Sequence, residues 1–219
     1  MDKITLLWLR NDLRLSDNPA LNFAVNNSKK IIIAYILDEK NHRHLGQASK
    51  WWLNHSLEKL NLASNCQLNF YQGDSQHILT KIVKDYDVKT IVWNRCYEPT
   101  RIAQDSKIKS FFKSQNLEVK SFNGSLLWEP WEILKSDQKP YKVFTHYYRN
   151  GCLKKPAPRF PEQKPEKINA IKDNNALSLN DLKLLPKIKW DQIMSQYWQI
   201  GEESAQQKLQ DFVVNGFQT

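Results

Sequence analysis

The sequence predicts an α/β fold in which a doubly wound, parallel five-stranded sheet over residues 1–125 is flanked by helices. Two observations predict it: short apolar runs of strand length recur in this region, and segments with helical spacing separate them. A repeated strand–helix–strand order gives a parallel sheet covered by helices, because crossovers between parallel strands are right-handed. The 219 residues, 41% of them hydrophobic, are enough to bury a core.

Five apolar runs are the expected strands. Ile4–Arg10 and Ile31–Leu37 are almost continuously apolar, whereas Gln67–Gly73, Thr90–Arg95 and Leu117–Asn123 are weaker. Runs this short, rich in β-branched and aromatic residues, are typical of strands that are buried on both faces of a sheet. Ligands of such sheets lie outside the carboxyl ends of the strands, so candidate site residues are sought there.

The segments between these runs predict helices. One is expected to start at Asn18-Pro19, and others to lie within Gln47–Leu62, Asp74–Asp85 and Thr100–Ser114. Asp74 and Thr100 occupy the expected N-cap positions, where a short polar side chain accepts from a free amide. The expected buried faces are Trp51, Trp52, Leu57 and Leu60; Ile78, Leu79, Ile82 and Val83; and Ile102, Ile108, Phe111 and Phe112.

After Phe144 the composition changes. Lys154–Lys167 contains four prolines, which predict an extended, irregular connector. Structure is expected again near Ser178–Trp190, and a last helix over Gly201–Val214 with Leu209, Phe212 and Val213 on a buried face. Such a face needs a partner.

The basic residues are concentrated in one segment. The net charge is +9, and residues 134–190 alone hold 13 basic and 5 acidic residues, or +8. Such a segment can attract DNA, but a solvated linker is the favoured interpretation. Any DNA binding by this chain alone is expected to be weak, indifferent to damage and steeply dependent on salt.

Several functional classes are excluded by the motifs that are missing. Neither G-x-G-x-x-G nor G-x-x-x-x-G-K-[ST] occurs, so the usual phosphate-binding loops are absent. Cys66, Cys96 and Cys152 are far apart, which predicts free thiols rather than disulfides or a zinc cluster. With no signal-peptide pattern and no apolar run of about 18 residues, we expect a cytoplasmic protein without a membrane span.

The loop after the first strand carries charged residues. Arg10, Asp12, Arg14 and Asp17 follow the strand directly, and arginine–carboxylate pairs can pin such a loop. Structural scaffolding is the favoured role, and contact of Arg10 or Arg14 with an anion or cofactor is the alternative.

This loop resembles the opening of the class I DNA photolyase and cryptochrome family, whose pattern is W-x-R-x-D-L-R-x-x-D-N-P-A-L. Trp8–Leu21 reads WLRNDLRLSDNPAL. Further segments resemble the family in the same order: GQASKWWLNHSLEKL (Gly46–Leu60), WNRCYEP (Trp93–Pro99), GSLLWEP (Gly124–Pro130), PYKVFTHYYR (Pro140–Arg149) and GEESAQQKLQDFV (Gly201–Val213). The resemblance implies three parts: a Rossmann-like domain over residues 1–130, an interdomain connector over 131–195, and, over 196–219, the first helix of a helical FAD-binding domain.

The resemblance also implies a function that this chain would perform only in part. In the family, the stretch that binds the FAD phosphates and the tryptophan relay follow the last helix matched here, so no catalytic residue is carried over. We expect the N-terminal part of a photolyase, a carbon–carbon lyase that repairs pyrimidine dimers with light, that is inactive alone. FAD and damaged DNA are expected only in the complete enzyme. A separately encoded FAD-binding helical domain would be the partner in a split enzyme.

Many family members also bind an antenna chromophore, a deazaflavin or a folate, beside the first domain. By their places after the second and fourth strands, Tyr35, Asp38 and Glu98 resemble parts of that pocket. A structural role of Asp38 and Glu98, as helix caps or in ion pairs, is an equal alternative. Two further alternatives are a stand-alone α/β module that binds a chromophore or nucleotide and a fragment of a cryptochrome-type photoreceptor. Val143-Phe144 is expected to be buried in this domain, the alternative being contact with the helical domain.

Overall fold

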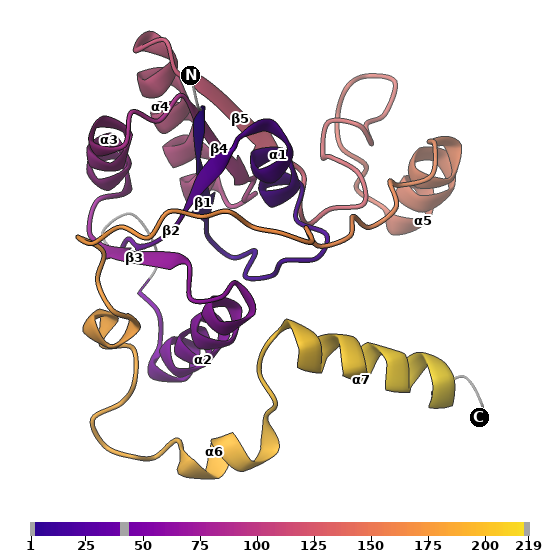
Figure 1. Ribbon diagram of the computed structural model, residues 1–219. Helices are drawn as coiled ribbons and strands as arrows, with labels where there is room; N and C mark the ends of the chain where they lie inside the picture. The colour runs from indigo at the N-terminus through magenta and orange to yellow at the C-terminus, as the bar shows by residue number, and fades with distance from the viewer. Residues whose placement is uncertain (1–2, 40–43, 217–219) are drawn as a thin grey trace.

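The computed structural model describes residues 3–39 and 44–216, and its centre is a parallel sheet (Figure 1). The strands lie in the order β3-β2-β1-β4-β5, and every pairing is parallel. This confirms the predicted fold class. The five strands are β1 (Ile4–Leu9), β2 (Lys30–Leu37), β3 (Leu68–Gln72), β4 (Thr90–Asn94) and β5 (Glu118–Phe122).

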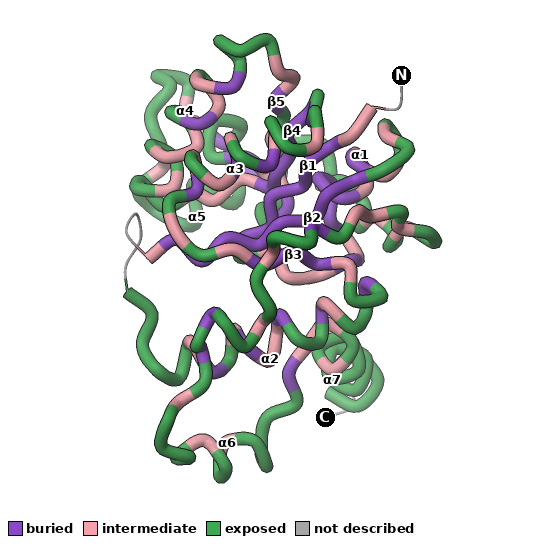
Figure 2. The backbone as a smooth tube through the Cα atoms, turned by 60° about the vertical axis from the view of Figure 1, so that its left-hand side comes forward, coloured by how far each residue is buried: buried purple, intermediate pink, exposed green. Residues whose placement is uncertain are grey.

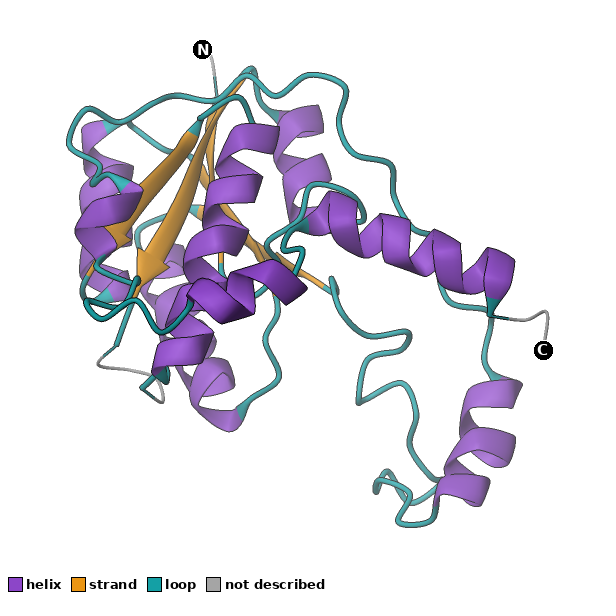
Figure 3. Cartoon of the chain, turned by 90° about the horizontal axis from the view of Figure 1, so that it is seen from below, coloured by secondary structure: helices purple, strands orange, loops and turns teal. Residues whose placement is uncertain are grey.

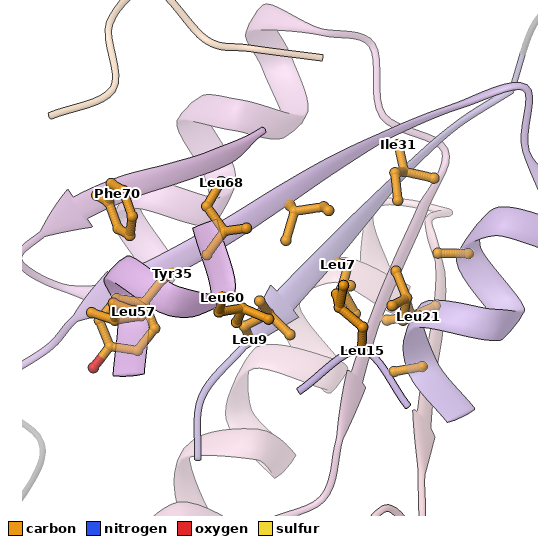
Figure 4. Packing of buried hydrophobic residues seen from close by; sticks show 14 of the residues in the cluster. Leu7, Leu9, Leu15, Leu21, Ile31, Tyr35, Leu57, Leu60, Leu68 and Phe70 are labelled. Carbon is orange, nitrogen blue, oxygen red and sulfur yellow. The ribbon is translucent and has the colours of Figure 1, made fainter. Parts of the chain in front are cut away.

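Helices cover both faces of the sheet, as Figure 3 shows. They are α1 (Pro19–Asn27), α2 (Gln47–Ala63), α3 (Ser75–Asp85) and α4 (Pro99–Ser114). Alternate residues of β2 point into two hydrophobic clusters on opposite faces of the sheet. Ile33 belongs to the cluster with Leu21 of α1 and Leu57 of α2. Ile32 belongs to the cluster with Leu79 of α3 and Phe112 of α4. We call these sides the α1/α2 face and the α3/α4 face, and Figure 4 shows residues of the first.

The helix starts agree with the sequence in two cases and disagree in one. Asn18 Oδ1 accepts from the Leu21 amide at 3.1 Å, and Asp74 Oδ1 accepts from the His77 amide at 2.8 Å. Thr100 is not an N-cap, because α4 begins one residue earlier, at Pro99. Proline has the φ angle of a first helical residue and lacks the N–H that would need a cap.

The predicted helix faces are buried only where the sheet reaches them. Trp51, Leu57 and Leu60 of α2 are at most 3% exposed, and the centres of α3 and α4 are buried as expected. Trp52 is 40% exposed and meets Trp198 edge to face at 5.4 Å, while Ile102 in the first turn of α4 is 48% exposed. Both predictions of burial were wrong, because these residues lie on the sides of their helices that point away from the sheet.

The remainder of the chain is mostly irregular. It contains α5 (Phe144–His146), a π-helical turn (Tyr147–Gly151), 3-10 turns at Cys152–Lys154 and Leu179–Leu182, α6 (Gln192–Tyr197) and α7 (Glu202–Asn215). Beyond the turn that ends at Lys154, residues 155–167 have no helix or strand, which confirms the irregular connector. The following stretch returns to the sheet, where Ala170 bridges to Ile31 and Leu177 to Phe70.

Hydrogen bonds hold this returning stretch against β3. Tyr71 and Tyr86 donate from their hydroxyls to the two carboxylate oxygens of Asp173, at 2.7 and 2.8 Å. The Asn69 amide donates to the Ile171 carbonyl at 3.0 Å and its oxygen accepts from the Asp173 amide at 2.8 Å. We call residues 168–177 the strap.

Two predicted buried surfaces are exposed instead (Figure 2). Leu209, Phe212 and Val213 of α7 are 63%, 58% and 54% exposed, and Val143 and Phe144 are 56% and 74% exposed. Their burial was predicted wrongly, because helical spacing identifies an apolar side without showing that this chain covers it.

Candidate functional site

The charged loop after β1 is built into the body of the domain. Arg10 is 4% exposed and bonds Asp105 of α4 through two nitrogens, at 2.5 and 3.2 Å. It also donates to the Asn94 carbonyl and lies over the Trp8 ring, 4.7 Å from its centroid. The partner of Arg10 is therefore in α4 and not in its own loop, and this geometry supports scaffolding.

Asn94, at the end of β4, joins two of the sequence motifs. Its amide nitrogen donates to Asp12 at 2.6 Å and to Asn18 at 2.7 Å, and its oxygen accepts from the Ala20 amide at 3.2 Å. A Cβ on Gly124 would lie 2.7 Å from Asn94 Cγ, so only glycine fits there. The glycine of the Gly124–Pro130 motif thus leaves space for the side chain of Asn94, the centre of this network.

A second network connects the Y-E-P turn with the W-E-P segment. Glu129 is 6% exposed and pairs with Arg95 through Nε at 3.0 Å and through Nη2. Tyr97 donates to the other oxygen of Glu129 at 2.8 Å, and burial together with this bond raises the Tyr97 pKa to about 12. These motif residues hold loops together, which leaves few of them free to bind a ligand.

Tyr35, Asp38 and Glu98 reach the same edge of the sheet but not the same face. Tyr35 belongs to the cluster of the α1/α2 face, and Figure 4 shows its hydroxyl at the rim of that cluster. Asp38 contacts Ser75 of α3 and Gln104 of α4, on the α3/α4 face. Glu98 is exposed at the N-cap position of α4. A ligand would have to lie across the strand ends to touch all three.

The contacts of Asp38 are compatible with the structural role that the sequence left open as an alternative. The side chain is 5% exposed, and one oxygen accepts from the Ser75 amide at 3.1 Å and from the Ser75 hydroxyl at 2.7 Å. It thereby binds the first residue of α3. Glu98 makes no capping bond with its side chain.

Two residues of α4 complete the edge, and sequence reasoning did not select them. Arg101 lies close enough to Tyr35 and Glu98 to interact with them electrostatically, and burial lowers the pKa of Arg101. Gln104 donates to Asp38 at 3.0 Å, but its buried Oε1 has no partner among the described residues. Helical spacing from Glu98 through Arg101 to Gln104 is the signal that would have found both residues.

The electrostatics at this edge favour binding over acid–base work. Burial raises the Tyr35 pKa to about 12, against the effect of Arg101, so its hydroxyl stays protonated and can donate. Burial also raises the Cys96 pKa despite Arg10 and Arg101, which makes a reactive thiolate unfavourable. Within residues 3–39 and 44–216, no group of three or more His, Cys, Asp or Glu residues could hold a metal ion.

Nothing in the described part of the chain is suited to span a bilayer. No helix there is both long enough and apolar enough.

Comparisons with known proteins agree with the motifs. The chain matches the protein family described as DNA photolyase over residues 5–166. It is 37% identical over 213 residues to the deoxyribodipyrimidine photo-lyase of Agrobacterium fabrum, which is 95% of this chain and 44% of that protein. Cryptochrome-1 of Arabidopsis thaliana is 34% identical over 170 residues, 75% of this chain and 25% of that protein.

Solved structures give the same result. A bacterial class III photolyase from Agrobacterium tumefaciens superposes with a TM-score of 0.90 at 35% identity, over 97% of this chain and 45% of that chain. A Synechocystis cryptochrome superposes with a TM-score of 0.82 at 24% identity, which supports the fold alone. The chain spans less than half the length of the photolyases it matches and corresponds to their N-terminal part. The resemblance read from the sequence is therefore confirmed, and the chain belongs to the DNA photolyase family.

Proposed function

We propose that these 219 residues serve a light-driven photolyase that repairs pyrimidine dimers, with FAD and the damaged base held by a helical domain outside them. The observation that carries this proposal is the 37% identity with the Agrobacterium fabrum photolyase over 95% of the chain. Bound FAD would supply the electron that splits the dimer. The proposed division is a Rossmann-like domain over 1–130, a connector over 131–195 and the first helix of the helical domain over 196–219.

The contacts of α7 support a role in docking that domain. Glu202, at the start of the helix, accepts from the amides of Leu15 and Ser16 at 2.7 and 2.8 Å. The first turn is thus fixed to the loop after β1, whereas Phe212 and Val213 farther along remain exposed. A helix that is anchored at one end and apolar at the other suits packing against further helices.

Complementation tests this proposal. The chain is mixed with the part of the Agrobacterium fabrum photolyase that it does not cover, and FAD retention and light-dependent loss of cyclobutane dimers are measured. Both are expected to require the two pieces together. Phe212→Asp should abolish the effect, whereas Lys208→Asp, also on α7, should preserve it. Assembly with FAD but without repair would instead favour the cryptochrome-type photoreceptor, and no assembly would reject the docking role.

We further propose that the strand-end edge binds an antenna chromophore, a deazaflavin or a folate, through Tyr35, Asp38 and Glu98. The unpartnered Oε1 of Gln104 and the cation of Arg101 support this, since a planar ring with N–H groups would satisfy the first and an acidic substituent the second. Titration of the chain with each pigment, followed by absorbance, tests the proposal and tells the two apart. Gln104→Leu should weaken binding, and Gln115→Leu, past the far end of α4, should not. Unchanged binding by Gln104→Leu would reject this site.

A further inference from the structure

A cavity lies away from the strand-end edge, between α2 and the segment that follows the strap. Its volume is about 580 Å³, which is within the range of small-molecule sites. Gln47, Lys50 and Asn54 of α2 form one wall, and Asn180, residues 183–188 and Trp190 form the other. Tyr35, Asp38 and Glu98 do not line it, so it is separate from the antenna proposal.

Asn54 contributes an amide to the wall of this cavity. The residue is only 5% exposed, and it lines the cavity from α2. An amide has two donor hydrogens and an acceptor oxygen, which a polar edge of a ligand can bond. The amides of Gln47 and Asn180 line the same cavity. The side-chain amides of the wall can therefore both donate hydrogen bonds to the polar edge of a ligand and accept them from it.

The charge of the lining is positive. Lys50, Lys183 and Lys187 contribute cations, and no carboxylate of a described residue lines the cavity. Lys50 is paired with Glu39 at 2.6 Å, and Lys183 interacts electrostatically with Asp181, outside the cavity lining. The ammonium groups of Lys183 and Lys187 favour an anionic substituent on the ligand.

The remaining lining favours a flat aromatic ring. Trp190 is 39% exposed and borders the cavity beside the apolar side chains of Leu184 and Ile188. Indole faces stack on heteroaromatic rings, and asparagine or glutamine amides can bond the edge of a base. We propose that this cavity binds a free 5′-mononucleotide, with the base on Asn54 and Trp190 and the phosphate on Lys183 and Lys187.

Calorimetric titration of the chain with AMP, GMP, adenosine, inorganic phosphate and a short oligothymidylate tests this site. We expect AMP or GMP to saturate one site per chain, and adenosine and phosphate each to bind more weakly. Asn54→Leu should reduce the affinity about tenfold or more, because the amide bonds to the base are lost. Absence of saturable mononucleotide binding, or tighter binding of the oligothymidylate than of either mononucleotide, would overturn the proposal.

A matched pair of lysine variants keeps the test decisive if Asn54→Leu does not fold. Lys187 lines the cavity and Lys189, two residues away, does not. Lys187→Ala should weaken AMP binding several-fold and leave adenosine binding unchanged, because only AMP carries the phosphate. Lys189→Ala should bind both as the unmodified chain does. Equal effects of the two variants would show that the attraction is general rather than a property of this cavity.

Discussion

α2 and α7 are amphipathic helices of the same chain with opposite surroundings. α2 packs on the sheet through Leu57 and Leu60, which are 0% and 3% exposed. α7 carries Phe212 and Val213 at comparable spacing, yet they are 58% and 54% exposed. The difference lies in the packing: the sheet that covers α2 is part of this chain, whereas the side chains at the far end of α7 remain more than half exposed. Apolar spacing therefore predicts which side of a helix seeks a partner, but not where that partner is.

The largest expected difference between the sheet domain and α7 is in the free energy of unfolding after a large side chain is removed. Phe112 is 0% exposed in the cluster between α4 and the sheet, so Phe112→Ala is expected to lower the free energy of unfolding by about 3–5 kcal/mol. Phe212→Ala in α7 should change it by about 0.5 kcal/mol or less. Urea unfolding of both variants measures this contrast, and similar losses would mean that α7 is packed in solution.

The next effect concerns charge. Asp105→Ala would leave the Arg10 guanidinium buried without its carboxylate, and a loss of about 3 kcal/mol is expected. The matched control is Lys89→Ala, which removes the exposed partner of Asp87 and should cost about 0.5 kcal/mol or less. Thermal and urea unfolding measure both changes. A small loss for Asp105→Ala would show that Arg10 reaches water when its partner is gone.

A third prediction concerns pH and the strap. Burial and the bond to Asp173 raise the Tyr86 pKa to about 12, whereas an unfolded tyrosine titrates near about 10. A raised folded pKa gives stability that is complete below about pH 10 and is lost as the pH rises through about 12. Tyr86→Phe should reduce this alkaline loss in melting experiments. Tyr148→Phe, at an exposed tyrosine, should preserve it, and an unchanged alkaline profile in Tyr86→Phe would contradict the contribution of Tyr86.

The smallest expected effect is at the junction of the two regions. Glu202→Ala removes the acceptor of the Leu15 and Ser16 amides, and a loss of about 1 kcal/mol is expected. Hydrogen exchange should become faster at these two amides while the amides of β1 stay protected. Glu203→Ala, the neighbouring glutamate in the first turn, is the control. If the two variants exchange alike, the anchor of α7 lies elsewhere.

The strands and helices could be predicted because their signals are local. Strand length and apolar content placed all five strands, and Asp74 marked the start of α3 correctly. The pairing of Arg10 with Asp105 could not be predicted, because the two residues are 95 positions apart and meet only when α4 packs on the sheet. The burial of Trp52 was predicted wrongly because its spacing fitted the apolar stripe, whereas the side chain lies on the side of α2 that points away from the sheet and is 40% exposed.

In the candidate site, too, some features follow from the local sequence and others depend on tertiary packing. That Tyr35, Asp38 and Glu98 lie near strand ends follows from the sequence, since parallel strands share one carboxyl edge. That Tyr35 and Asp38 lie on opposite faces also follows from the alternation of a strand, because their positions differ by an odd number. The role of Gln104 could not be inferred, because it depends on how close the second turn of α4 comes to Asp38.

The strap has a consequence for solubility. β3 is an outer strand of the sheet, and an uncovered outer strand is a template on which the strand of another molecule can add. Leu177 pairs with Phe70 and Asn69 bonds Ile171, so residues 168–177 occupy that template in every folded molecule. A chain without these residues is expected to keep the core of the sheet but to expose β3 as an edge on which a second molecule can add. Such a chain should therefore self-associate more readily than the whole chain.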